Sequence, residues 1–280
     1  MARTLRNVIE FFGVGLHSGE ESRLRLLPCE REGFFFRTKN GEFPISAAVV
    51  EEDNRLTGFK LPDGSKIRTA EHLLSSIVGM GLDSVVIELE GEEVPILDGS
   101  AYPFAEKIAE AGIVKIGRYV RPRCVSAPVV IDEAEAGRFL AALPSEETRI
   151  TYIIDYPDTI IGVQRVSYIV TEKTFLGIIS RARTFGLTSE INYLKSHGLA
   201  KGGTLDNAML FDDKRILNSG GLRFPLEAVT HKATDLLGDL ALLGFLPKAH
   251  YVAICAGHGV HGRLTDKLRR IFNQEIAEFN

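Results

Sequence analysis

The stretch THKATDLLGD, residues 230–239, places His231, Asp235 and Asp239 at intervals of four residues. In a helix, side chains at this spacing lie on one side, one above the other. An amphipathic surface helix accounts for such a stripe, because polar faces normally lie in water. Solvated faces favour Lys, Glu and Gln, whereas this stripe carries short side chains of the kind that bind metal ions. Both interpretations are open from the stripe alone, and its composition favours a cleft.

The composition is that of a soluble globular protein. The 280 residues are 45% hydrophobic and 25% charged, which is enough to bury a core. A net charge of −4 argues against a broad nucleic-acid surface. Cys29, Cys124 and Cys255 are odd in number and lack Cys-x-x-Cys spacing, which favours a reducing compartment. Without an apolar signal segment or a membrane-length apolar run, we expect a cytoplasmic protein with no membrane span.

The first half of the chain mixes strand and helix patterns. Alternating apolar residues predict strands over 22–28, 33–38 and 83–91. Helical spacing predicts one helix over 70–78, with Thr69 as its N-cap and Gly79 or Gly81 as its stop. A second short helix is predicted over 102–112.

The second half repeats this mixture. We expect strands over 138–144, 149–156, 164–170 and 250–257, and helices over 188–196 and 227–243. The segment 116–130 carries prolines and clustered arginines and is the candidate domain boundary. The sequence thus predicts an α+β protein of two domains, 1–122 and 123–280, each with helices on one face of a mostly antiparallel sheet.

His231 and Asp235 can reach one ion from one helix, and imidazole with carboxylate suits zinc, but a third ligand is needed. In TAEHLLSS, residues 69–76, His72 lies in the first turn of a predicted helix and directly follows Glu71. A carboxylate at that position is turned about 100° around the helix and can act as general base on a water beside the metal. Two simpler interpretations also apply: Glu71 favours the positive end of the helix dipole, and His72 is an ordinary surface histidine.

Glycine-rich segments supply weaker signals. GVGLHSG, residues 13–19, and LAKGGTLDNA, residues 199–208, are compatible with phosphate-binding loops or with simple turns. In CAGHGVHG, residues 255–262, glycines flank His258 after a predicted strand, which suits a histidine presented at a strand end or a flexible surface turn.

In combination, these segments closely resemble the UDP-3-O-acyl-N-acetylglucosamine deacetylases, zinc hydrolases of the committed step of lipid A biosynthesis. Eight blocks occur in the order of that family: GVGLHSG, TAEHLLSSIVGMGLDS, VPILDGSAYPF, SRARTFGL, KGGTLDNAM, NSGGLRF, HKATDLLGDL and AGH. The resemblance covers nearly the whole chain. It implies two α+β domains, each a sheet layered with two helices, that enclose the active site between them.

The resemblance also implies roles for individual residues. The ligands of one catalytic Zn2+ would be His72, His231 and Asp235, and Fe2+ could occupy the same set. The catalytic residues would be Glu71 as general base, His258 as the cation that protonates the leaving amine, Asp239 as the residue that orients His258, Thr184 as oxyanion stabiliser, and Lys232 near substrate phosphate or the polarised carbonyl. His261, three residues after His258, stands where the family often has Asn, and has no assigned role.

The substrate-binding residues implied by the resemblance are Phe185 and Glu190 for the sugar and His17 for the diphosphate. Leu187, Ile191 and Leu194 share a helical stripe that would line a passage for the fatty acyl chain, or would simply pack a short helix. We expect a monomer that binds an acylated UDP-sugar and no nucleic acid. The alternatives are a non-catalytic nucleotide-sugar-binding regulator and a zinc amidase acting on another acetylated substrate.

Overall fold

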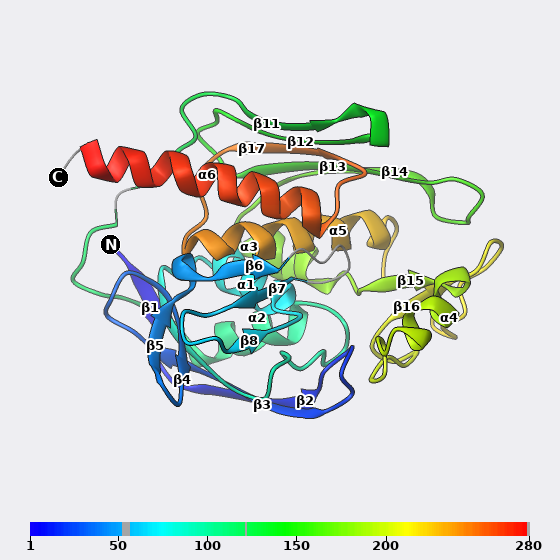
Figure 1. Ribbon diagram of the computed structural model, residues 1–280, viewed down its shortest axis with the longest axis horizontal. Helices are drawn as coiled ribbons and strands as arrows, with labels where there is room; N and C mark the ends of the chain where they lie inside the picture. The colour runs from blue at the N-terminus through cyan, green and yellow to red at the C-terminus, as the bar shows by residue number, and fades with distance from the viewer. Residues whose placement is uncertain (52–56, 121, 279–280) are drawn as a thin grey trace.

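The computed structural model describes residues 1–51, 57–120 and 122–278 of the chain. Two five-stranded sheets form the outer layers, and two layers of helices lie between them (Figure 1). The fold is α+β with mostly antiparallel sheets, as the sequence predicts. In the part of the chain described here, no helix has the length and apolar character needed to cross a membrane.

The first half of the chain builds one sheet in the order β2-β3-β9-β4-β5. Its strands are β2 (Ile9–Val14), β3 (Glu21–Pro28), β4 (Gly33–Thr38), β5 (Gly41–Pro44) and β9 (Ser84–Glu90). β4 and β9 run parallel and the other neighbours antiparallel. In β3 the alternating residues Leu24 and Leu26 are fully buried, so the period-two pattern marks the core face.

Shorter elements complete this half. They are β1 (Arg3–Leu5), which pairs with β10 (Ile113–Lys115); the small sheet of β6 (Val49–Glu51), β7 (Gly58–Lys60) and β8 (Lys66–Ile67); and the helices α1 (Glu71–Gly79) and α2 (Tyr102–Ala111). α1 and α2 cover the inner face of the sheet (Figure 1).

The second half builds a sheet in the order β11-β12-β17-β13-β14. Its strands are β11 (Val129–Glu133), β12 (Arg138–Leu143), β13 (Arg149–Tyr156), β14 (Gly162–Ile169) and β17 (His250–Ile254), with β13 and β17 parallel. The remaining elements are α3 (Glu172–Gly177), β15 (Phe185–Leu187), α4 (Thr188–Ser196), β16 (Met209–Phe211), α5 (Glu227–Leu240) and α6 (His258–Glu278). α5 and α6 lie on the inner face of this sheet (Figure 1).

The central contact of the molecule is the packing of α5 on α1, which joins the two halves. Every residue of α5 except Lys232 is buried, so its polar stripe does not lie in water. The approach is closest at Gly238, where a Cβ atom would lie 2.6 Å from the Cα atom of Glu71. Only glycine lets the two backbones meet at this distance.

Most predicted elements are confirmed. β4, β13 and α4 coincide at both ends with the predicted ranges 33–38, 149–156 and 188–196. The predicted connection between the halves, 116–130, lies largely between β10 and β11; residue 121 is outside the described residues. The division at 122–123 stays a prediction.

Two details of the sequence prediction are wrong. The N-cap of α1 is Ala70, not Thr69, because Thr69 has a left-handed backbone (φ 53°) and its hydroxyl donates to Glu93 Oε1 at 2.7 Å. The sequence analysis predicted no helix after residue 257, where the structure has the long helix α6; His258 follows the strand β17 and begins this helix, so the alternative of a flexible surface turn is excluded. Gly259 and Gly262 lower its intrinsic helix propensity, and packing on β11, β12 and α5 overrides that local signal.

Gly238→Ala should destabilise the protein by about 1–3 kcal/mol, the usual cost of overpacking, because the added methyl group meets rigid backbone of α1. Urea unfolding measures the change. The matched control is Gly262→Ala in α6, whose Cβ would lie 3.7 Å from Val50 Cγ1, an ordinary contact; this variant should be stabilised by up to about 1 kcal/mol. Equal stability of the two variants would contradict the close contact.

Candidate active site

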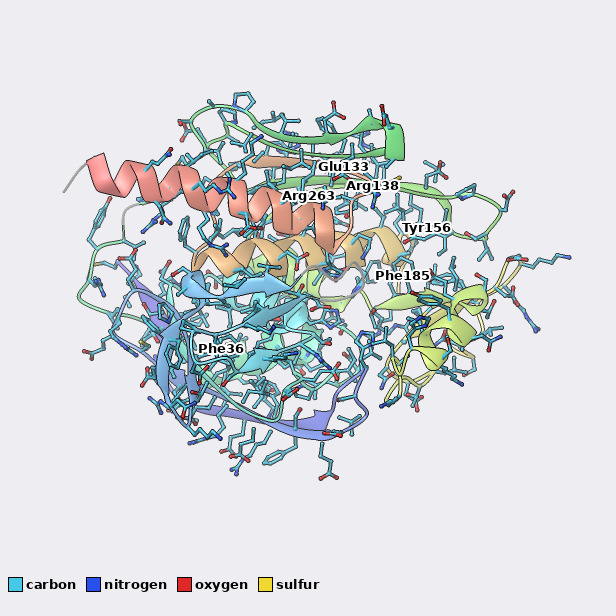
Figure 2. The ribbon with its side chains drawn as sticks, viewed as in Figure 1. Phe36, Glu133, Arg138, Tyr156, Phe185 and Arg263 are labelled. Carbon is cyan, nitrogen blue, oxygen red and sulfur yellow. The ribbon has the colours of Figure 1, made fainter. Side chains whose placement is uncertain are left out.

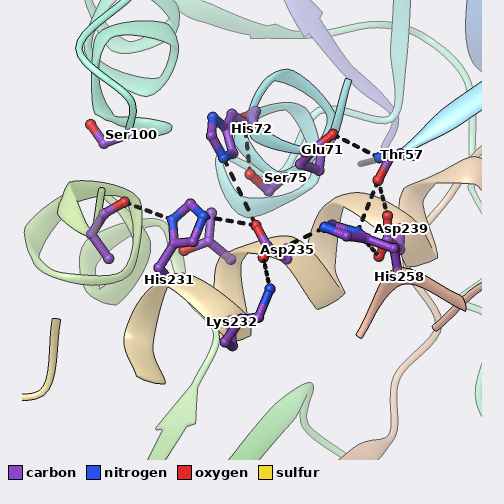
Figure 3. Close-up of polar contacts among 12 residues, drawn as sticks. Thr57, Glu71, His72, Ser75, Ser100, His231, Lys232, Asp235, Asp239 and His258 are labelled. Atoms are coloured by element: carbon purple, nitrogen blue, oxygen red, sulfur yellow. Dashed lines mark hydrogen bonds and ion pairs between the residues drawn. The ribbon is translucent and has the colours of Figure 1, made fainter. Parts of the chain in front are cut away.

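Two helices bring three potential metal ligands together (Figure 3). His72 is the second residue of α1, while His231 and Asp235 lie one turn apart on α5. Asp235 Oδ1 lies 3.2 Å from His231 Nε2 and 3.8 Å from His72 Nε2. Ligand atoms about 2.0–2.1 Å from a tetrahedral zinc ion are separated by about 3.3 Å, so the spacing fits one ion.

The chemistry of this cluster also fits a cation. Asp235 Oδ1 is buried and has no hydrogen-bond partner among the described residues, and such an atom normally needs one. Burial, reinforced by His231, lowers the pKa of His72 to about 3, and burial lowers the pKa of His231 as well. Both imidazoles are therefore neutral, the form that binds metal ions.

Neighbouring groups orient these ligands. His231 Nδ1 lies 3.1 Å from the carbonyl oxygen of Ala182, which leaves Nε2 directed at the cluster. Lys232 Nζ donates to the other oxygen of Asp235 at 2.6 Å. Burial opposes the charge of Asp235, but His231 and Lys232 hold the pKa of this carboxyl well below its usual value. The carboxylate is therefore ionised and points one free oxygen at the two histidines.

Glu71 and His258 flank the cluster from different helices, and their proton affinities differ (Figure 3). Burial, with repulsion from Asp235 and Asp239, raises the pKa of Glu71 to about 7. Burial opposes the charge of His258, but Asp239, whose Oδ2 lies 2.8 Å from Nδ1, raises the pKa of this imidazole to about 9. Between these values one residue is a base and the other an acid.

Thr57 is a site residue that the sequence analysis missed. Its backbone N–H donates to Glu71 Oε2 at 3.2 Å, and its hydroxyl donates to Asp239 Oδ1 and lies 3.3 Å from His258 Nδ1 (Figure 3). Thr57 thus connects the groups on both sides of the site. It lies in no motif, and no local pattern in the sequence singles it out.

A buried ion pair positions the segment that carries Thr184 and Phe185. Arg183 Nε donates to Glu227 Oε1 at 2.7 Å, and Arg183 Nη2 donates to Glu227 Oε2 at 3.1 Å. The side chains of Arg183 and Glu227 are 11% and 1% exposed. Thr184 N–H also donates to the carbonyl oxygen of Gly99 at 2.7 Å, so the segment is tied to both halves of the chain.

Close approach of the glycine-rich segments closes the site. Gly99 has φ +81°, and a Cβ there would lie 2.7 Å from the carbonyl carbon of Asn207. His17 is buried. Its backbone N–H donates to Glu93 Oε1 at 2.9 Å, and the backbone N–H of Ala200 donates to its ring Nδ1 at 3.3 Å. These segments form a wall of the site and lie in no phosphate-loop arrangement of strand and helix.

A single cavity of about 600 Å3 joins these parts, within the range of small-molecule sites. Thirteen of the fourteen predicted site residues line it: His17, Glu71, His72, Thr184, Phe185, Leu187, Glu190, Ile191, Leu194, His231, Lys232, Asp235 and His258. The fourteenth, Asp239, lies behind His258. Because α4 contains no buried residue, Ile191 and Leu194 do not belong to the core.

Among the cavity residues that the sequence analysis did not predict are Tyr156 and Arg138. Tyr156 is the last residue of β13, and its ring packs edge-on against that of Phe185, with 5.6 Å between the ring centroids (Figure 2). Arg138 is the first residue of β12, and its Nε lies 3.4 Å from Glu133 Oε2. Glu133 also pairs with Arg263 of α6 (Figure 2). Polar residues at strand ends are a usable signal for such positions, whereas their convergence depends on the sheet.

Two histidines and an aspartate that could hold one metal ion, with Glu71 and His258 beside them, form a site of the kind found in metal-dependent hydrolases. Residues 2–270 match the family model for UDP-3-O-acyl N-acetylglycosamine deacetylase. A UDP-3-O-acyl-N-acetylglucosamine deacetylase of Thermodesulfovibrio yellowstonii is 39% identical over 279 residues, 99% of this chain and 94% of that protein. The enzyme of the same name from Trichormus variabilis is 40% identical over 281 residues, 96% of this chain and 99% of that protein. The chain belongs to the UDP-3-O-acyl N-acetylglycosamine deacetylase family, whose members hydrolyse an amide.

Glu227→Ala should destabilise the protein by about 3–5 kcal/mol, because it removes the carboxylate that neutralises the largely buried Arg183 guanidinium and leaves it only the carbonyl oxygen of Gly221. Thermal or urea unfolding measures the loss. The matched control is Glu147→Ala, which breaks an exposed pair with Arg149 (3.8 Å) and should cost less than about 1 kcal/mol. A cost for Glu227→Ala as small as that of the control would show that the pair does not hold this segment.

Proposed function

We propose that the protein hydrolyses the N-acetyl group of UDP-3-O-acyl-N-acetylglucosamine, producing UDP-3-O-acyl-glucosamine and acetate, with one Zn2+ held by His72, His231 and Asp235. The observation that carries this proposal is the buried, unpartnered Oδ1 of Asp235, which faces the Nε2 atoms of two neutral histidines. The family to which the chain belongs acts in lipid A biosynthesis.

Three protein ligands leave a coordination position free, as hydrolytic zinc sites require. A bound zinc ion supplies Lewis acidity, which polarises the acetamide carbonyl and makes water more acidic. Fe2+ accepts the same ligands, and metal analysis of the purified protein distinguishes the two.

Glu71 is the general base of the proposed reaction. Its carboxylate accepts a proton from the water that attacks the acetamide carbon, and the Thr57 N–H holds one carboxylate oxygen in place. His258 donates its Nε2 proton to the leaving amine nitrogen as the carbon–nitrogen bond breaks. Asp239 stabilises the imidazolium through Nδ1.

Thr184 and Lys232 complete the catalytic group. The Thr184 hydroxyl stabilises charge on the carbonyl oxygen, as an oxyanion-hole donor does. Burial opposes the charge of Lys232, but Asp235 and Tyr156 raise the pKa of this amine well above its usual value. Lys232 therefore stays cationic beside the cavity, where it meets the substrate phosphate or the polarised carbonyl.

The remaining cavity residues bind the substrate. Phe185 and Glu190 contact the sugar, and His17 contacts the diphosphate. Leu187, Ile191 and Leu194 line the path of the acyl chain. Two observations support this role: all three side chains line the cavity, and α4 has no residue buried in the core.

The proposal includes the organisation and setting of the chain. Residues 1–122 and 123–280 are its two domains, supported by the separate sheet that each half builds. A cytoplasmic location agrees with the free state of Cys29, Cys124 and Cys255. The proposed monomer is tested by light scattering of the purified protein.

Purified protein with Zn2+ should release acetate from UDP-3-O-acyl-N-acetylglucosamine and should lose this activity on chelation. His231→Ala should lower bound metal well below one ion per chain, because two ligands hold zinc poorly. Substrate without its acyl chain should react more slowly, since each buried CH2 contributes about 0.8 kcal/mol. Full turnover by metal-free protein would end the proposal, and equal turnover of simple acetamides would assign another substrate.

Glu71→Gln should keep its zinc and lose about 10²- to 10⁴-fold in kcat, the usual contribution of a positioned general base. Metal content and steady-state kinetics check both statements. Glu147→Gln on the surface is the control and should match the wild type. If Glu71→Gln lost its metal, Glu71 would be a ligand instead of a base.

The pH profile of kcat/KM should be bell-shaped. As pH falls below about 7, Glu71 gains a proton and the rate declines; a bound cation moves this limb to lower pH. As pH rises above about 9, His258 loses its proton and the rate declines again. Asp239→Asn removes the charge that supports the imidazolium, so the alkaline limb should shift to lower pH. An unchanged alkaline limb would show that Asp239 does not raise the pKa of His258.

A further inference from the structure

The Asp239 carboxylate has a third partner that the proposed reaction does not use. Its Oδ1 accepts from the Thr57 hydroxyl, and its Oδ2 lies 2.8 Å from His258 Nδ1. The same Oδ2 lies 2.7 Å from Nδ1 of His261, a fully buried histidine one turn further along α6. Two imidazoles thus share one carboxylate oxygen, and only His258 borders the cavity.

The distances distinguish this group from a second metal site. Asp239, His258 and His261 are close enough to be considered as ligands of one ion. The separations of 2.7 and 2.8 Å are hydrogen-bond lengths, shorter than the roughly 3.3 Å between ligand atoms of a tetrahedral zinc ion. The group is therefore a hydrogen-bonded network.

The proton arrangement of His261 follows from its partners. Nδ1 of His261 faces the Asp239 carboxylate, which is ionised, so Nδ1 carries a proton. The Tyr152 hydroxyl donates to the carbonyl oxygen of Ala256 at 2.6 Å, and its oxygen lies 2.9 Å from Nε2 of His261. Both ring nitrogens of His261 thus have a polar neighbour, and Tyr152 also anchors the backbone that leads into His258.

We propose that His261 is a positioning residue for the reaction: its Nδ1–H holds the Asp239 carboxylate in the orientation that fixes the ring of His258. This inference rests on the proposed function, in which His258 is the acid. The final side-chain torsion of an aspartate is broad, so a carboxylate bound only by His258 turns easily. Thr57 on Oδ1 and His261 on Oδ2 restrict this rotation from opposite ends.

The position of His261 explains why a histidine is useful here. Gly259 and Gly262 weaken the first turns of α6, where His258 begins the helix. The bond from His261 to Asp239 attaches this turn to α5, which also carries Asp235. His261 thus acts on the direction of the His258 ring relative to the metal ligands and touches no substrate.

His261→Asn and His261→Leu form a matched pair, because their side chains have nearly the same shape and only Asn keeps a donor near the position of Nδ1. In the zinc-loaded protein, His261→Leu should lower kcat by about 10- to 100-fold, the usual effect of losing an orienting partner, with KM and metal content unchanged. His261→Asn should restore most of that loss. Equal kcat for the two variants would overturn the proposal. So would a wild type that binds two metal ions per chain together with a His261→Leu variant that binds one.

A double-mutant cycle separates positioning from general destabilisation. In the Asp239→Asn background, His261→Leu should cause little further loss of kcat, because the carboxylate through which it acts is absent. The same fold loss in both backgrounds would make His261 a purely structural residue.

The proton on Nδ1 of His261 gives a test that does not depend on activity or on the Leu variant folding. Imidazole nitrogen NMR of the histidine-labelled, zinc-loaded wild type should show His261 protonated on Nδ1; an unprotonated Nδ1 would overturn the proposal. A wild type with Nδ1 protonated but no deacetylase activity would refute the proposed function and leave the hydrogen-bond arrangement intact.

Discussion

The backbone contact between α5 and α1 is the constraint on which the rest of the structure depends. At Gly238 the two helices meet so closely that a Cβ would lie 2.6 Å from Glu71 Cα. This contact fixes the axial position of α5 relative to α1, and therefore determines which turn of α5 faces the start of α1. Asp235, one turn before Gly238, comes opposite His72, and Asp239 comes opposite Thr57, beside Glu71. The candidate metal site and the proposed acid–base pair are thus consequences of one packing contact between the two halves of the chain.

Charge is the second constraint, because the contact buries three carboxylates. Isolated buried charges are expensive, and each carboxyl group avoids the cost differently. Asp235 is paired with Lys232 and faces the two histidines, Asp239 accepts from three neighbours, and Glu71 keeps a pKa near 7. A divalent cation bound at Asp235 Oδ1 would supply the positive charge that this arrangement lacks. The charge interactions that stabilise the buried carboxylates are therefore the same ones that set the pKa values of the proposed base, Glu71, and the proposed acid, His258.

The predictions that succeeded came from patterns that local geometry dictates. The strands β4 and β13 and the helix α4 carry regular spacing and are bounded by turn residues, so their limits were found at both ends. Those that failed depend on contacts between distant segments. Thr69 is a good N-cap residue, but its hydroxyl is used by Glu93. The glycines at the start of α6 indicate a turn, and the sheet and α5 hold them in a helix.

The sequence by itself determined which side chains share a helical face, because the spacing of His231, Asp235 and Asp239 is a property of the α-helix. Its motifs, through their resemblance to a family, also indicated thirteen of the residues that line the cavity. Only the tertiary structure decided that His72 faces Asp235, that Thr57 joins Glu71 to Asp239, and that His261 shares the Asp239 carboxylate with His258. These contacts join residues on separate elements. Their distances follow from how α1, α5 and α6 pack, which no local pattern encodes.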